Sequence, residues 1–252
     1  MKRIEISSAT ITRRFYVGTA AWNNPPDERA SRPDDRSHLA HYATQFRAVQ
    51  INSAFYRQHR RATYERWRGS TPRDFRFSVK TPRSITHEGA LRHYRKELGQ
   101  FLQEVAGLKS KLRVILVQTP ASLAFEAAVS TRFFKSLSAA APCRIVVEPR
   151  HPSWFSARAE ALLTRYGVAR AAADPARVPT AGVPSGGRGL VYFRLHGSPR
   201  MYYSKYNIDA LRELSTNLTS HHGSIKEIWC IFDNTAQHAA WGTALTLRLL
   251  SA

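Results

Sequence analysis

The chain lacks several features that would assign it to a specialised class of protein. Its two cysteines, Cys143 and Cys230, are too far apart for a metal-ligand pair, and both lie in apolar runs. It has no run of about 20 apolar residues, so we expect no membrane-spanning helix. The first 18 residues contain no apolar segment of the kind found in a secretory leader. We therefore expect buried, reduced thiols and a cytoplasmic protein.

Acidic residues are scarce relative to basic ones. Asp and Glu together number 18 against 38 Lys and Arg, which gives a formal net charge of +20, and arginine supplies most of the excess. This balance favours an anionic small-molecule ligand, or nucleic acid bound through non-specific charge. A compositional preference for arginine would give the same charge without any such partner. The sequence leaves the oligomeric state open.

Strand-like and helix-like segments alternate along the 252 residues. β-Branched or aromatic runs predict strands at 15–19, 47–52, 74–80, 113–118, 143–148, 168–173, 189–195 and 226–232. Helices are expected between them at 37–45, 62–68, 96–108, 126–140, 156–166, 208–221 and 235–249. These β/α units predict one domain over residues 1–252, a TIM-type (β/α)8 barrel. An open doubly wound sheet is the alternative, but the glycine-rich turn typical of its first strand is missing.

Several predicted strands alternate between apolar and polar residues. In the strand at 74–80, Phe77 and Val79 fall on one face, and Ser78 and Lys80 fall on the other. If helices cover the outside of a barrel, the polar faces point inward. The same phase places further polar side chains inside, namely Gln50, Asn52, Arg76, Gln118, Glu148, Arg170, Asp174, Tyr192, Arg194 and His196. The sequence therefore predicts a polar lumen whose groups must be paired or hydrated.

The predicted strands end in short motifs, and the active sites of barrels form at that end. In order, the motifs are GTAAW (18–22), INSAFYR (51–57), VKTPRSITHE (79–88), QTP (118–120), EPRHPSW (148–154), AAD (172–174), RLHGS (194–198) and FDNT (232–235). From Tyr16 to about Leu250 this ordered set resembles the YecE-like proteins, the family known as domain of unknown function 72. The resemblance implies a TIM-type barrel and brings no established activity with it.

The chain departs from the pattern of that family at several positions. Gln50 stands where the family has Glu, GTAAW replaces GTSGW, QTPASLAF is a looser form of QLPPSF, and FDNTAQ replaces FNND. The loss of acidic residues argues against a metal site of the barrel-isomerase kind. Metal-ligand residue types do occur at strand ends, but no close-spaced pair such as HExxH accompanies them. We assign no metal ligand and leave the cofactor open.

The motif EPRHPSW holds the densest group of chemically capable side chains. Glu148 is a candidate general acid or base, with His151 as its partner. The alternative is structural: Glu148 pairs with Arg150 or Arg194, and His151 caps a backbone group.

Lys80 is a candidate for two roles. It can bind a phosphate or carboxylate, or form a Schiff base if Arg76 and Arg194 lower its pKa. The alternative is that Asp174 or Glu148 neutralises its charge.

The full set of candidates lies at predicted strand ends. The catalytic candidates are Lys80, Glu148, His151 and His196. The ligand-binding candidates are Asn52, Tyr56, Gln118, Arg150, Asp174, Arg194, Asp233 and Asn234. We expect an anion to lie within reach of Lys80 and Arg194, although Arg194 can also be structural. Asn52, Tyr56 and Trp22 can line a pocket, or the aromatic rings can simply pack.

The stretch RQHRRATYERWR, residues 57–68, is strongly basic. It can contact a phosphate backbone with Tyr64 or Trp67 stacking on bases, or it can be a solvated helix face, which we favour.

Three functions stay open. The first is an enzyme or binder of an anionic, phosphate-bearing ligand, and the second is a nucleic-acid-associated, nuclease-like hydrolase. The third is a non-catalytic ligand-binding or scaffold barrel. A deep, narrow, isolated lumen would favour the first, and basic residues clustered around the barrel mouth would favour the second. An internally paired lumen with no open volume would favour the third.

Overall fold

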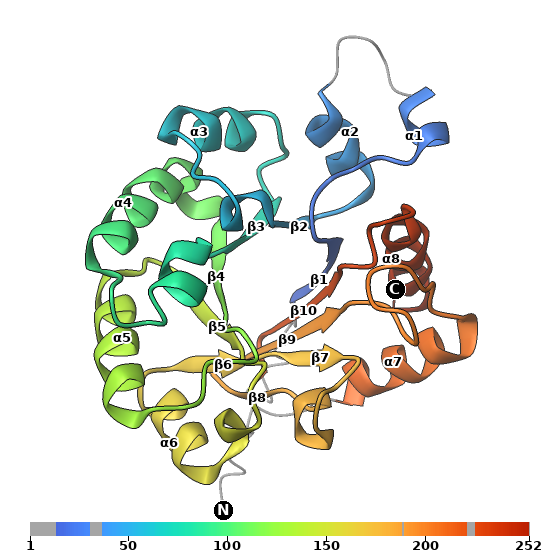
Figure 1. Cartoon of the computed structure of the whole chain (residues 1–252). Coiled ribbons are helices and arrows are strands. Elements are labelled where there is room, and N and C mark those ends of the chain that lie inside the picture. The colour runs from blue at the N-terminus through green and yellow to red at the C-terminus, as the bar shows by residue number, and fades with distance from the viewer. Residues whose placement is uncertain (1–13, 31–36, 188, 221–224, 252) are drawn as a thin grey trace, which may run out of the picture.

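The computed structural model describes residues 14–30, 37–187, 189–220 and 225–251. Its strands are β1 Arg14–Thr19, β2 Ala48–Ile51, β3 Arg76–Lys80, β4 Leu112–Gln118, β5 Arg144–Glu148, β6 Val168–Arg170, β7 Ala172–Asp174, β8 Ser185–Gly186, β9 Leu190–Leu195 and β10 Glu227–Phe232. Its helices are α1 Pro26–Ala30, α2 His38–Gln45, α3 Arg61–Gly69, α4 Arg95–Val105, α5 Ala127–Ala140, α6 Ala157–Arg165, α7 Ile208–Ser220 and α8 Ala239–Leu250. The strands surround a common centre and the helices lie outside them (Figure 1).

The predicted elements overlap observed ones throughout, with three differences. The predicted strand 168–173 is divided into β6 and β7. The predicted helix 96–108 ends at Val105, and the chain continues as a 3₁₀ segment, Ala106–Lys111. The sequence does not predict the two short elements α1 and β8, because five and two residues carry too little periodicity to be recognised.

The strands form two sheets rather than one continuous ring. The first has the order β1-β10-β9-β7, and the second has the order β2-β3-β4-β5-β6-β8. All neighbours are parallel except β6 and β8. The prediction of a parallel α/β fold is therefore confirmed. A closed ladder of eight strands is not present in the described residues.

A tyrosine fills one of the two junctions between the sheets. The Tyr42 hydroxyl accepts a hydrogen bond from Thr19 N at 2.9 Å and donates one to Ala48 O at 2.9 Å. It thereby replaces the backbone ladder between β1 and β2, which pair only in an isolated bridge between Ala20 and Gln50. Buried backbone groups are almost always paired, so this hydroxyl satisfies the two strands where they separate.

The second junction lies within one extended segment. β6 pairs with β5, and β7, which follows after Ala171, pairs with β9. Ala171 N still donates to Val147 O at 2.8 Å. A single run of chain therefore leaves one sheet and joins the other.

The two faces of the strands pack into separate apolar clusters. The outer cluster contains Phe77 and Val79 of β3 and side chains from the helices, so the predicted alternation is correct there. The inner cluster is a layer of apolar side chains at mid-height: Tyr16, Ala20, Ala48, Val114, Leu116, Val146, Ala169, Ala171, Leu190, Tyr192, Trp229 and Ile231. The predicted polar lumen is thus found at the ends of the strands, with an apolar layer between them.

Both thiols are free. Burial raises the pKa of Cys143 to about 12 and raises that of Cys230 further. Cys230 is fully buried and Cys143 is partly buried. Within the described ranges no helix has the length and apolar character needed to cross a membrane.

Candidate functional site

Six ionisable side chains meet at the carboxyl ends of the strands. They come from β3, β5, β9 and β10 and from the residues that follow those strands. The members are Lys80, Glu148, Arg150, Arg194, His196 and Asp233. We call this set the carboxyl-end cluster. All six are site residues predicted from the sequence, and the inward phase of alternating strands explains why they converge.

Arg194 lies at the centre of the carboxyl-end cluster and is 1% exposed. Its NH1 donates to Glu148 Oε2 at 2.8 Å, and its NH2 donates to Asp233 Oδ2 at 2.8 Å. Its Nε donates to Gln50 Oε1 at 3.0 Å. Every nitrogen of this guanidinium therefore has an acceptor inside the protein.

The two carboxylates are held in their ionised form. Burial alone would raise the pKa of Glu148, but Arg194, Arg150 and His196 hold it well below its usual range. Burial likewise opposes ionisation of Asp233, and Arg194 and His196 lower its pKa in spite of it. Neither group is suited to donate a proton near neutral pH. Both are fixed negative charges.

His196 bridges the two carboxylates. Its Nδ1 lies 3.1 Å from Asp233 Oδ2, and its Nε2 lies 3.0 Å from Glu148 Oε1. Arg150 NH2 lies 2.8 Å from the same Nε2. A neutral ring can donate from Nδ1 and accept from Arg150, and an imidazolium would donate to both carboxylates. His196 is thus within hydrogen-bonding distance of both carboxylates of the cluster.

Lys80 is the member without a hydrogen-bond acceptor among the described residues. It is 5% exposed, and its Nζ lies 3.8 Å from the centroid of the Phe55 ring. Burial, together with Arg194 and Arg150, lowers its pKa to about 7, although Glu148 and Asp233 act in the opposite direction. A lysine titrating near neutral pH in a cluster of charges is typical of functional sites.

Arg150 is a second member of the cluster with a hydrogen-bond donor that has no acceptor among the described residues. Its NH2 binds Glu148 Oε1 at 2.6 Å, but its Nε is buried with no hydrogen-bond partner. The cluster therefore contains three cationic side chains, Lys80, Arg150 and Arg194, against the two carboxylates. The expected excess of positive charge is present when Lys80 is protonated.

Below the cluster, neutral polar groups complete the network. Tyr192 donates to Ser78 Oγ at 3.0 Å, and its hydroxyl lies 3.2 Å from Gln50 Oε1. Gln50 Nε2 is 3.4 Å from Asn52 Oδ1. An amide at position 50 can accept from Arg194 without adding a third carboxylate, so the departure from the family pattern fits the local charge.

Two residues predicted to lie inside lie on the outer face instead. Arg170 pairs with Glu160 of α6 and donates to the carbonyls of Thr180 and Val183. Asp174 accepts a hydrogen bond from the Tyr206 hydroxyl at 2.6 Å. The interior positions of this segment belong to alanines such as Ala169 and Ala171. In the segment ARAAAD neither face carries large apolar side chains, so the sequence does not show which residues point inward. The prediction that Arg170 and Asp174 point inward was therefore wrong.

Three further candidates, His151, Asn234 and Gln118, follow or end strands at the same end of the sheets. No hydrogen bond to a member of the cluster is found for them in the described residues. His151 accepts from Ser153 N through Nδ1 at 3.2 Å and so begins a 3₁₀ turn, as the structural alternative predicted. Asn234 Nδ2 donates to Ser204 O at 2.9 Å, while its Oδ1 is buried without a partner. Gln118 ends β4 opposite Glu148 and is partly exposed.

Phe55 is the site residue that the sequence does not reveal, whereas its neighbour Tyr56 is among the predicted candidates. A 3₁₀ turn, Ser53–Phe55, follows β2 and brings Phe55 to Lys80. Tyr56 is 70% exposed on the rim. Trp22 packs against Trp67 at 5.0 Å between ring centroids and lines a cavity of about 230 Å³ with Asn23, Asn24 and His38.

The rings of the basic stretch 57–68 are not available for stacking on bases. Tyr64 is fully buried, and Trp67 packs edge-on against Trp22, His59 and Tyr64. Arg61 and Arg66 of α3 are exposed, whereas Arg68 is partly buried. This arrangement matches the solvated-face interpretation.

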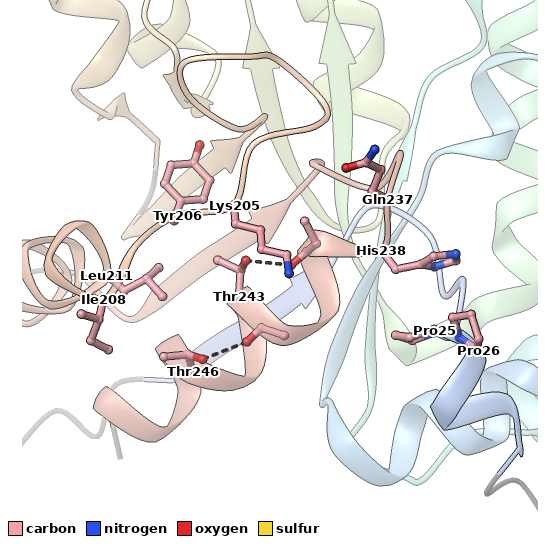
Figure 2. A pocket seen from close by; sticks show the side chains of 12 residues that line it. Pro25, Pro26, Lys205, Tyr206, Ile208, Leu211, Gln237, His238, Thr243 and Thr246 are labelled. Carbon is pink, nitrogen blue, oxygen red and sulfur yellow. Dashed lines mark hydrogen bonds between the residues drawn. The ribbon is translucent and has the colours of Figure 1, made fainter.

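The largest cavity described, about 850 Å³, lies outside the carboxyl-end cluster. Figure 2 shows Ile208 and Leu211 of α7 on one side of this groove and Pro25 and Pro26 on the other, with Thr246 of α8 between them. No carboxylate occurs among the described residues that line it. Because the charged chemistry is concentrated in the cluster, we identify the cluster as the candidate site.

Metal-ligand geometry is not found in the part of the chain that the structure describes. No group of three His, Cys, Asp or Glu side chains there is arranged to hold an ion. In the cluster, guanidinium groups occupy Glu148 Oε1, Glu148 Oε2 and Asp233 Oδ2. The donors that would have to face a metal therefore face arginines.

The sequence profile of the family described as "Protein of unknown function DUF72" matches residues 16–252. The chain belongs to the DUF72 family. This confirms the resemblance drawn from the ordered strand-end motifs. The match covers all members of the carboxyl-end cluster and the strands that position them.

Relatives in bacteria support the same assignment. The UPF0759 protein YecE of Escherichia coli (strain K12) is 31% identical over 143 residues, which is 56% of this chain and 50% of that protein. The matched region thus spans half the length of that curated relative. A DUF72 family protein from Enterococcus faecalis V583 has a TM-score of 0.78 at 21% identity, covering 94% of this chain and 95% of that one. One from Thermotoga maritima MSB8 has a TM-score of 0.76 at 23% identity, covering 94% and 99%. These two likenesses establish a shared fold.

Proposed function

We propose that the carboxyl-end cluster is a binding site for a small anionic ligand, of which a phosphate-bearing compound is the best fit. One observation carries the proposal. Lys80 is a nearly buried amine with no acceptor among the described residues, and it lies within a cluster that holds more cationic groups than carboxylates. Buried excess charge is costly, so an anion offsets it. In this proposal the strands act as one TIM-type barrel domain.

The roles of the arginines follow from their hydrogen bonds. Each nitrogen of Arg194 already donates a hydrogen bond inside the protein, so we assign it the structural role of holding Glu148 and Asp233 in place. Direct contact with the anion falls to Lys80 and to the unpaired Nε of Arg150. The anion expected on Arg194 is therefore reassigned to Lys80 and Arg150. Charge-assisted hydrogen bonds of this kind contribute about 1.5–3 kcal/mol each.

The other two functions receive less support. Nucleic-acid binding through aromatic stacking receives little support, because Tyr64 is fully buried and Trp67 is partly buried in edge-on contact with it. A purely structural lumen would leave no reason for an acceptor-free amine at Lys80, since buried polar groups are normally paired. A non-catalytic binder of the same anion is consistent with the site. Covalent reactivity at Lys80 would separate an enzyme from such a binder.

Thermal denaturation with increasing inorganic phosphate tests the proposal. A ligand at one hundred times its Kd adds about 2.7 kcal/mol to the free energy of unfolding. We expect this gain in the wild type and its loss in Lys80→Met. Lys205→Met removes the same charge from an exposed lysine of the distant groove and serves as the matched control. Equal stabilisation of all three proteins by phosphate would contradict the proposal.

A further inference from the structure

We propose that Lys80 is a nucleophilic amine that forms a Schiff base with a small aldehyde or ketone carrying an anionic group. The proposal builds on the anion site described above and names the chemistry and ligand class of that site. It rests on geometry: the amine is nearly buried, lies over the apolar Phe55 ring at 3.8 Å, and faces a cluster of fixed charges. Desolvated lysines near other cations are the ones that act as nucleophiles.

Comparison with a second buried lysine makes the case specific. Lys111 is 9% exposed, and burial lowers its pKa as well. Its Nζ donates to Arg68 O at 2.7 Å, to Thr71 O at 2.7 Å and to Thr71 Oγ1 at 3.0 Å. Three acceptors fix that group as an ammonium ion. Lys80 lacks such acceptors among the described residues, so its lone pair can be freed without breaking hydrogen bonds.

Imine formation begins from the neutral amine of Lys80 and proceeds in two stages. Near neutral pH a substantial share of Lys80 is the free amine, because its pKa is about 7. The nitrogen attacks the carbonyl carbon, a C–N bond forms, and the carbonyl π pair moves to oxygen, which takes up a proton. The nitrogen then loses a proton and the new hydroxyl takes up a second one, so the nitrogen lone pair forms C=N as the C–O bond breaks and water leaves. Loss of the remaining N–H proton gives the neutral imine. The net change is amine plus carbonyl to imine plus water, with no oxidant or reductant.

The cluster also explains why the carbonyl compound carries an anionic group. A protonated imine keeps the positive charge of the ammonium form, and Glu148 and Asp233 are the fixed negative charges acting on it. The unpaired Nε of Arg150 remains as a donor for a phosphate or carboxylate on the ligand. His196 lies within hydrogen-bonding distance of both carboxylates and helps to hold them beside the amine. The ligand is taken to be small, and the described cavities of about 850 Å³ and 560 Å³ lie elsewhere.

Reductive trapping on the full chain tests the inference. The protein is incubated at pH 7.5 with glycolaldehyde phosphate or with phosphate-free glycolaldehyde, and the imine is reduced with cyanoborohydride. Peptide mass spectrometry then locates the adducts. We expect glycolaldehyde phosphate to label Lys80 at least tenfold faster than Lys111 or Lys205. We also expect inorganic phosphate to slow labelling at Lys80 alone, and the rate at Lys80 to level off just above pH 7.

The outcomes distinguish this inference from the proposed function. Lys80 left unlabelled in the folded protein, while phosphate still stabilises the wild type, would overturn the Schiff-base chemistry and leave the anion site intact. Equal labelling of Lys80 by both aldehydes, without competition by phosphate, would support the nucleophile and overturn the anion site. Uniform labelling of all lysines would contradict the inference. Because the decisive measurement is made on the wild type, a folding defect in a variant cannot obscure it.

Discussion

Arg113 and Glu227, which belong to different sheets, form an ion pair at the amino-terminal end of the strands. Arg113 Nε donates to Glu227 Oε2 at 2.9 Å, and Arg113 NH2 binds Oε1. Glu227 is 3% exposed, and Arg14 NH1 approaches it at 3.8 Å. The pair thus links β4 with β10 at the end opposite to the carboxyl-end cluster.

We predict that Arg113→Met lowers the free energy of unfolding by about 3 kcal/mol, because it leaves the buried Glu227 carboxylate with Arg14 alone. Arg47→Met is the matched control. Its ion pair with Asp74 is more than half exposed on both sides, and such pairs contribute at most about 1 kcal/mol. Urea denaturation measures both variants. Similar losses in the two would show that burial of Glu227 does not determine the cost.

Removing the charge of Glu148 is predicted to lower the free energy of unfolding more than Arg113→Met does. Glu148→Gln leaves the guanidinium groups of Arg150 and Arg194 short of a buried partner, and we expect a loss of about 3–5 kcal/mol. Glu65→Gln breaks an exposed pair with Arg61 and provides the comparison, with an expected loss below about 1 kcal/mol. The thermal midpoints of the two variants give the answer. A midpoint for Glu148→Gln as high as that for Glu65→Gln would refute the central role of this carboxylate.

Lys80 makes the stability depend on pH in a defined window. Its pKa is about 7 in the folded protein against an ordinary value of 10.5, so the unfolded chain binds more protons between those values. The free energy of unfolding contributed by this group therefore rises as the pH increases from about 7 to 10.5. Below that window the burial of the ammonium costs up to about 5 kcal/mol.

Lys80→Met removes that dependence. We expect the variant to exceed the wild type in stability at pH 7 and below, and the difference to shrink as the pH approaches 10.5. Denaturant midpoints of wild type and variant across this range measure the difference. For Lys205→Met the curve is expected to run parallel to that of the wild type. A constant difference between Lys80→Met and wild type at every pH would contradict the assignment.

Two glycine-to-alanine variants test whether the backbone next to the site requires a glycine. Gly197 follows His196 with φ +92°, and a Cβ there would lie 2.8 Å from Ser204 O. We expect Gly197→Ala to cost about 1–3 kcal/mol, because the strained backbone and the carbonyl must both shift. Gly99 in α4 has open space around its Cβ position, so Gly99→Ala is expected to add about 0.5–1 kcal/mol. Calorimetry of both variants should give opposite signs.

Strand alternation explains how much of the site could be predicted. Phe77 and Val79 against Ser78 and Lys80 define an outer and an inner face, and the structure keeps both. The same reasoning correctly brings Glu148 and Arg194 together. Both strands are long enough, and different enough between their two faces, for the period of two residues to fix the phase.

Sequence reasoning fails where that period is absent. Around Arg170 the neighbours are alanines, and nothing in their pattern distinguishes inside from outside. Phe55 lies in a 3₁₀ turn, where alternation no longer applies, so the sequence favours its neighbour Tyr56 instead. The hydroxyl of Tyr42 joins two strands that are adjacent in space. From the sequence alone, Tyr42 is indistinguishable from an ordinary core residue of a helix. Such contacts depend on tertiary packing that one sequence does not encode locally.

The inner apolar layer, which includes Tyr16, Tyr192 and Trp229, separates the charged side chains at the two ends of the strands. Arg76 and Lys80 stand four positions apart on β3, which is about 13 Å at about 3.3 Å per residue. In the layer, Tyr192 and Trp229 are stacked with ring centroids 6.0 Å apart, and the members of its apolar cluster carry no ionisable group other than phenols. The energetic costs of Arg113→Met and Glu148→Gln are therefore expected to add within about 0.5 kcal/mol in the double variant. We therefore expect an anion bound in the proposed site to enter and leave at the carboxyl ends of the strands.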